Sequence, residues 1–132
     1  METPLIPEIS LTDVSPEVRS FIYQTISEFT PFATPDTEVQ VLEKSPLELL
    51  QNEDAPELSR AQLKRMHRIE ISLSDSGSTI SAEGMDRDIY GAITKAKVKL
   101  MEILTQIQDD VISNSDRSNQ IRQALAAGGT IH

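Results

Sequence analysis

The side chains of this sequence that could do chemistry are basic, and they gather in two short clusters. The clusters are Lys64-Arg65-x-His67-Arg68 and Lys95-x-Lys97-x-Lys99. Cationic heads at this spacing suit the phosphate groups of a nucleic acid, which they contact without reading its sequence. Lys95 and Lys97 have no acidic residue three or four positions away, so no neighbour on the same helix would neutralise them. A solvated charged face is the alternative interpretation, since most runs of charge do no more than that.

Residues for catalysis or metal binding are scarce. The chain has no cysteine and two histidines, His67 and His132, which excludes disulfides, thiolate metal sites and cysteine nucleophiles. The Gly-x-Ser-x-Gly, Gly-Lys-Ser/Thr and Gly-x-Gly-x-x-Gly motifs of hydrolases and nucleotide-binding folds are missing. The acidic pairs Glu53-Asp54 and Asp109-Asp110 are interpreted as solvated surface. We therefore expect a binding protein that is not an enzyme and uses no cofactor or metal.

The charge of the chain is acidic overall but unevenly distributed. Its 132 residues include 21 acidic and 12 basic side chains, for a net charge of −9. Residues 1–60 hold twelve acidic and three basic side chains, whereas residues 61–132 hold nine of each. Because salt limits the reach of a distant charge to about 10 Å, a local basic surface can still bind phosphate on this acidic protein.

Length and hydropathy fit a single domain in the cytoplasm. A chain of 132 residues suits one domain. No apolar run approaches the roughly 20 residues that a bilayer span needs. The first eight residues are acidic and interrupted by proline, so we expect no secretory leader.

The first half of the chain predicts one helix and two short strands. Ser15-Pro16-Glu17 combines a capping serine, a proline at the first helical position and an acid in the first turn. Pro31 ends this helix. The alternating stretch Ile9-Ser10-Leu11 predicts a strand that the prolines before it confine to a sheet edge. Residues 38–41 alternate polar with apolar side chains and predict a half-buried strand.

The second half predicts a hairpin followed by a long helix. Residues 68–74 alternate, Asp75-Ser76-Gly77 supplies turn chemistry, and Ile80 and Ala82 alternate on the way back. After the acids Asp86 and Asp88, apolar residues between 89 and 111 fall on one side of a helix. We expect Ser113-Asn114-Ser115-Asp116 to interrupt it, with a second helical piece from 116 to 127 that Gly128-Gly129 ends.

These elements predict an α+β fold with the order β-α-β-β-β-α. Two amphipathic helices on one face of a four-stranded sheet make a two-layer sandwich. We expect one domain over residues 1–112, with an acidic insertion loop at about 45–60 that contains one helical turn at 46–51. Residues 113–132 are expected to form a C-terminal helical extension.

Part of the sequence resembles a known family. The residues that carry the resemblance are Lys64-Arg65-Met66-His67-Arg68-Ile69-Glu70, Gly77, Ile80, Ala82, Asp88-Ile89-Tyr90-x-Ala92-Ile93 and Lys99-Leu100. This pattern resembles the ribosome hibernation promoting factor family, whose members were long called sigma-54 modulation proteins. The match is close over residues 64–104.

The resemblance implies a fold similar to double-stranded RNA-binding domains and a role in translation regulation. Members of the family dock on the small ribosomal subunit, in the groove used by mRNA and tRNA, and idle the ribosome under stress or in stationary phase. Carried over position by position, the residues that would contact 16S rRNA or ribosomal proteins are Lys64, Arg65, His67, Arg68, Lys95 and Lys99. Tyr90, Ala92 and Ile93 would be packing positions of the helix.

The sequence also departs from the family pattern, which keeps a second interpretation open. The first helix, which normally carries lysines, offers Arg19 against Glu17 and Glu28. Acids at Asp109-Asp110 follow where family members usually continue with bases. The alternative is therefore a module that kept the fold but binds another protein, through the acidic first half, instead of RNA.

Overall fold

The computed structural model describes residues 5–12, 14–51 and 59–127, and the side chains of its last helix as far as Asp110. The chain divides into two compact units, residues 1–101 and 102–132. The first unit holds the whole sheet, and the described residues of the second, 102–127, are helical. The domain division expected at residues 112 and 113 stays a prediction.

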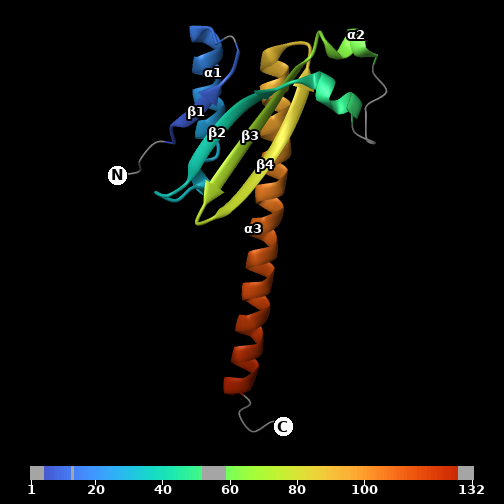
Figure 1. Cartoon of the computed structure of the whole chain (residues 1–132). Coiled ribbons are helices and arrows are strands. Elements are labelled where there is room, and N and C mark those ends of the chain that lie inside the picture. Colours follow the sequence, from blue (N-terminus) through green and yellow to red (C-terminus); the bar gives the residue numbers. More distant parts are fainter. Residues whose placement is uncertain (1–4, 13, 52–58, 128–132) are drawn as a thin grey trace. The chain divides into compact units, whose positions relative to one another are not determined.

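Four strands form one sheet in the order β1-β2-β3-β4 (Figure 1). They are β1 (Pro7–Ser10), β2 (Glu38–Lys44), β3 (His67–Asp75) and β4 (Ser78–Asp86). β1 pairs parallel with β2, whereas β2, β3 and β4 are antiparallel. The expected edge strand is confirmed, because β1 lies at one edge of the sheet. The hairpin is confirmed as well, and its turn has Ser76 and Gly77 at positive φ angles of 53° and 84°.

Two helices pack on one face of this sheet, behind the strands in the view of Figure 1. They are α1 (Pro16–Ser27) and the start of α3 (Ile89–Ala127). Side chains of both helices and of β2 and β3 form the buried core, with Val18, Ile22, Ile26, Phe29, Val39, Val41, Ile69, Ile71, Ala92, Ile93, Ala96 and Leu100 among its members. The predicted two-layer α+β sandwich is confirmed.

The two helices run in the same direction. Ser15 caps α1, since its hydroxyl oxygen accepts a hydrogen bond from the amide of Val18 at 3.2 Å. The rings of Phe21 and Tyr90 meet edge to face with centroids 5.1 Å apart, and Lys97 Nζ lies 3.1 Å from Glu28. Both contacts join residues 69 positions apart, so α1 and the start of α3 are parallel neighbours.

One glycine sets how closely α3 approaches the sheet. A Cβ on Gly84 of β4 would fall inside contact distance of the Ala92 carbonyl oxygen and the Ala96 amide nitrogen, and 2.8 Å from the Lys95 Cβ. Only a residue without a side chain fits here, because backbone atoms cannot move aside like the end of a flexible side chain. Gly84 therefore allows the buried side of α3 to lie directly on β4.

Short helical turns lie in and near the expected insertion loop at about 45–60. The predicted turn is confirmed as a 3₁₀ helix, η2 (Pro46–Gln51), and another 3₁₀ turn, η1 (Thr30–Phe32), follows α1. A further short helix, α2 (Arg60–Leu63), was not predicted from the sequence; Ser59 and Gln62 form a reciprocal capping box at its start. Residues 52–58 of the expected loop lie outside the described residues.

The predicted break in the last helix is wrong. α3 is continuous from Ile89 to Ala127 and includes residues 113–116. Serine, asparagine and aspartate cost a helix only a few tenths of a kcal/mol each relative to alanine, whereas glycine or proline costs about 1–3 kcal/mol. The described part of α3 extends to Ala127, and Gly128-Gly129, predicted to end the helix, lies outside the described residues. No helix in the described ranges has a stretch apolar enough to cross a bilayer.

Candidate nucleic-acid interface

Three exposed cations flank one end of the sheet. β3 begins at His67 and β4 ends at Asp86, and these two residues are paired in the register. The chain before β3, with Lys64 and Arg65, and the chain after β4, with Arg87, therefore leave the sheet side by side at the same end. All three cations are exposed, and none has an ion-pair partner among the described side chains. We call Lys64, Arg65 and Arg87 the basic rim.

Local packing presents the first two cations of the basic rim to solvent. The capping box of Ser59 and Gln62 starts α2, and Leu63 at its last position is fully buried. Burial of a leucine contributes about 2 kcal/mol, so it anchors the segment. Lys64 and Arg65, which follow Leu63 directly, are left on the outside.

Arg87 was not predicted from the sequence, in which it lies between the acids Asp86 and Asp88. In the structure both carboxylates have other partners. Asp86 accepts a hydrogen bond from the amide of Asp88 at 2.9 Å, and Asp88 accepts one from the amide of Tyr90 at 3.2 Å at the start of α3. The signal that would have found Arg87 is the capping role of an aspartate one residue before a helix.

Lys95 is not free, contrary to the sequence-based expectation. Its Nζ lies 2.8 Å from Asp86 and donates to the Met85 carbonyl oxygen at 3.2 Å. The pKa of Asp86 is held below its ordinary value by the backbone amide of Asp88, the Lys95 ammonium and the amide of Arg87. Lys97 is also paired, with Glu28 directly after α1. Helical spacing could exclude partners on the same helix, but these partners come from β4 and from the end of α1.

Arg68 is a buried structural residue and not the free cation that the sequence suggested. It lies on the open face of the sheet, where its side chain is 10% exposed. Its Nε and Nη2 donate to the two carboxylate oxygens of Glu83 at 2.8 and 3.1 Å, and its Nη1 donates to the Ser45 carbonyl oxygen at 3.1 Å. Each guanidinium nitrogen therefore has a protein acceptor.

Lys44 extends this ion-pair network on the open face. Its Nζ lies 2.6 Å from Glu70 and 3.0 Å from Glu83. Hydrogen bonds to Glu70 and Glu83 raise the pKa of Lys44. Burial acts to raise the pKa of Glu83, but hydrogen bonds from Arg68 and Lys44 outweigh it and lower that pKa. The charged groups on this part of the sheet therefore pair with one another.

His67 and Lys99 complete the set of predicted contact residues. His67 Nδ1 lies 3.6 Å from Glu43, at the end of the sheet. Lys99 is exposed on α3 and has no ion-pair partner within the described part of the chain. Of the six predicted residues, Lys64, Arg65 and Lys99 are thus available to an external phosphate, whereas His67, Arg68 and Lys95 face protein carboxylates.

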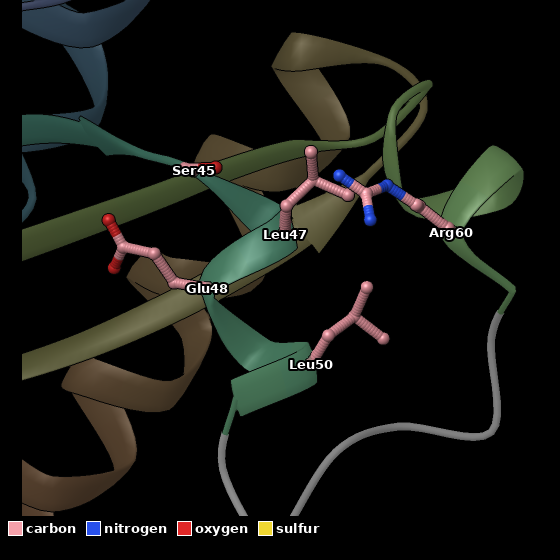
Figure 2. Close-up of a pocket in the computed structure, with 5 residues that line it drawn as sticks. All are labelled: Ser45, Leu47, Glu48, Leu50 and Arg60. Atoms are coloured by element: carbon pink, nitrogen blue, oxygen red, sulfur yellow. The ribbon is translucent and has the colours of Figure 1, made fainter.

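A shallow pocket between η2 and α2 offers little chemistry. Figure 2 shows the side chains that line it, which are those of Ser45, Leu47, Glu48, Leu50 and Arg60. Leu47, Leu50 and Arg60 point toward the space, while Glu48 points away from it; Glu48 lies 3.5 Å from Arg68. Among the described residues there is also no group of histidines and carboxylates that could hold a metal ion.

Comparison with known proteins finds solved structures with a similar fold but no match by sequence. No family model matches the chain, and no curated protein matches it. Among solved structures, a ribosomal subunit interface protein from Coxiella burnetii is 15% identical with a TM-score of 0.53, over 78% of this chain and 97% of that one. The N-terminal domain of Protein Y from Thermus thermophilus is 14% identical with a TM-score of 0.54, over 80% of this chain and 99% of that one.

Both solved structures belong to the ribosome hibernation promoting factor family that the sequence resembles. At 14–15% identity the likeness shows a shared fold. It covers nearly the whole length of both domains, so the chain contains the complete fold of each of them.

Proposed function

We propose that this protein binds the small ribosomal subunit, in contact with 16S rRNA, and inhibits or protects idle ribosomes in stressed or stationary cells. This role requires no catalysis and would place the protein in the cytoplasm. The fold shared with a ribosomal subunit interface protein and with Protein Y supports a ribosomal partner. The observation that carries the proposal for this chain is the basic rim, whose three cations are exposed and unpaired among the described residues.

The number of available cations limits how strong and how salt-dependent the binding is. Six exposed cations have no ion-pair partner among the described side chains and allow at most six direct phosphate contacts; they are Arg19, Arg60, Lys64, Arg65, Arg87 and Lys99. Each phosphate contact contributes about one unit to the slope of log affinity against log salt. We therefore expect a slope of about six or less, and binding that is lost at high salt.

Sedimentation with purified ribosomal subunits tests the proposal. At low salt the protein should travel with the small subunit, and at high salt it should remain at the top of the gradient. A protein that stays at the top at every salt concentration would contradict the proposal.

A charge-matched pair of variants tests the basic rim. Lys64→Gln with Arg65→Gln makes the chain two units more negative and removes two rim cations. Thr105→Glu with Gln106→Glu makes the same change in net charge on exposed positions of the second unit. We expect the first variant to lower affinity at least tenfold and the salt slope by about two, and the second to bind like wild type.

The paired cations support a second candidate function. Four basic side chains lie beside protein carboxylates, which leaves fewer free cations than the sequence predicts. The pairs are Lys95 with Asp86, Arg68 with Glu83, His67 with Glu43 and Lys97 with Glu28. A module of the same fold that binds a basic protein through its acidic first half would account for this. It predicts no effect of Lys95→Glu with Lys99→Glu on partner binding, whereas the ribosomal role predicts that the charge reversal at Lys99 weakens it.

A further inference from the structure

The second unit of the structure is a helix with an apolar seam. α3 continues through residues 102–127, and Ile107 is 44% exposed. From Ile107 onward the sequence repeats residues alternately four and three positions apart, namely Ile107, Val111, Asn114, Ser118, Ile121 and Leu125. This spacing is that of the seam of a coiled coil, in which each such residue inserts between residues of a facing helix.

A helix of this kind needs a partner. Most helical stability in proteins comes from packing of an apolar face and not from the intrinsic preference of the residues. Between 109 and 119 the segment contains three serines and five asparagine or aspartate residues, and these favour a helix only weakly. A second helix along the seam would supply the packing of an apolar face that such a segment lacks by itself.

We propose that residues 105–127 of two copies of this chain pair as an antiparallel helical dimer. The charges of the segment support this occupant and orientation. Glu102, Asp109 and Asp110 make the first part acidic, whereas Arg117 and Arg122 against Asp116 make the last part basic. An antiparallel pair brings the acidic part of each copy beside the basic part of the other, while a parallel pair brings like charges together.

One alignment satisfies the whole seam. If Asn114 lies level with the second copy's Ser118, then Val111 is level with Ile121 and Ile107 with Leu125. Polar residues then meet polar residues, apolar residues meet apolar residues, and the two segments overlap over all of 105–127. A polar pair inside an apolar seam also favours this alignment over its neighbours.

The mass of the protein in solution tests the dimer. The full chain should have twice its monomer mass of 14.6 kDa at micromolar concentration. Ile107→Glu places a charge in the seam and should give a monomer, whereas Thr105→Glu adds the same charge off the seam and should leave the dimer intact. A wild-type protein that is monomeric throughout this range would overturn the proposal.

Charge reversal tests the orientation without touching the seam. Asp109→Arg with Asp110→Arg makes the whole segment basic, and this variant should dissociate. Adding Arg117→Glu and Arg122→Glu to it exchanges the two charged parts, and this fourfold variant should dimerise again. Failure of the fourfold variant to regain the dimer, with its helix content kept, would overturn the antiparallel arrangement.

Cysteine crosslinking gives a direct measurement, since the chain has no cysteine of its own. Ile107→Cys and Leu125→Cys variants should form a disulfide with each other when mixed. Neither should form one alone, because residues 107 of the two copies would be about 27 Å apart along the axis. Efficient crosslinking of either variant alone would indicate a parallel dimer and would contradict the proposal.

Discussion

The guanidinium of Arg68 is bound by both carboxylate oxygens of Glu83 across the β3–β4 pair, at 2.8 and 3.1 Å. This bidentate interaction is stronger and more directional than an ion pair with a single hydrogen bond. It explains why an arginine in the most basic stretch of the sequence serves the sheet and not an external phosphate. The pair also makes a prediction about stability.

Loss of Glu83 should destabilise the protein more than loss of an exposed acid. Glu83→Gln leaves the buried Arg68 charge without its main acceptor, and we expect the free energy of unfolding to fall by about 1–2 kcal/mol. Urea denaturation followed by circular dichroism measures it. Glu102→Gln on exposed α3 is the control, with an expected change within about 0.5 kcal/mol. Equal effects of the two variants would show that the Arg68–Glu83 pair contributes nothing.

Gly84→Ala should be destabilising because of space and not because of backbone conformation. The added Cβ would collide with backbone atoms of Ala92 and Ala96, and separating α3 from β4 should cost about 1–3 kcal/mol. Gly77→Asn is the comparison, since Gly77 has a φ of 84° with no atom within 4 Å of a Cβ. Asparagine tolerates that conformation, so the thermal midpoint should fall less in this variant.

Stability should fall in acid. Hydrogen bonds from Thr12 and His67 outweigh burial and hold the pKa of Glu43 below 4.5, and Arg68 and Lys44 do the same for Glu83. A carboxyl whose pKa is lower in the folded state than in the unfolded chain stabilises the folded state. This contribution is complete above the pKa of the unfolded chain and is lost as the pH falls through the pKa of the folded state. We expect the free energy of unfolding to decline below about pH 4.5.

Denaturation at a series of pH values measures this decline. Glu43→Gln with Glu83→Gln should be less stable at pH 7 and should lose less stability between pH 7 and acid than wild type does. An unchanged dependence on pH would mean that other carboxyls account for it.

Arg87 should contribute to ribosome binding as much as each of the predicted rim residues. We expect Arg87→Gln to lower affinity for the small subunit several-fold and the salt slope by about one. Lys97→Gln removes the same charge from a lysine already paired with Glu28 and should bind like wild type. Binding assays across a salt series measure both variants. If Arg87→Gln matches wild type at every salt concentration, the basic rim does not include Arg87.

Local patterns in the sequence were sufficient for most of the fold. Ser15-Pro16 located the start of α1, the alternation of residues 68–74 located β3, and the turn at Asp75-Ser76-Gly77 joined it to β4. These signals act over a few residues, because capping, alternation and turn formation depend on near neighbours. The predicted break at 113–116 is wrong because serine, asparagine and aspartate disfavour a helix only weakly, unlike glycine or proline.

The availability of each cation was decided by the tertiary structure alone. The sequence by itself determined that basic residues cluster at 64–68 and 95–99. It could not determine that Glu83 reaches Arg68, that Asp86 reaches Lys95 or that Glu28 reaches Lys97. Ion pairs depend on distance in space, and the folded chain brings these partners together from 9 to 69 residues away. Of the two acidic neighbours of Arg87, Asp86 is paired in space with Lys95, whereas Asp88 accepts a local hydrogen bond from the amide of Tyr90 at the start of α3.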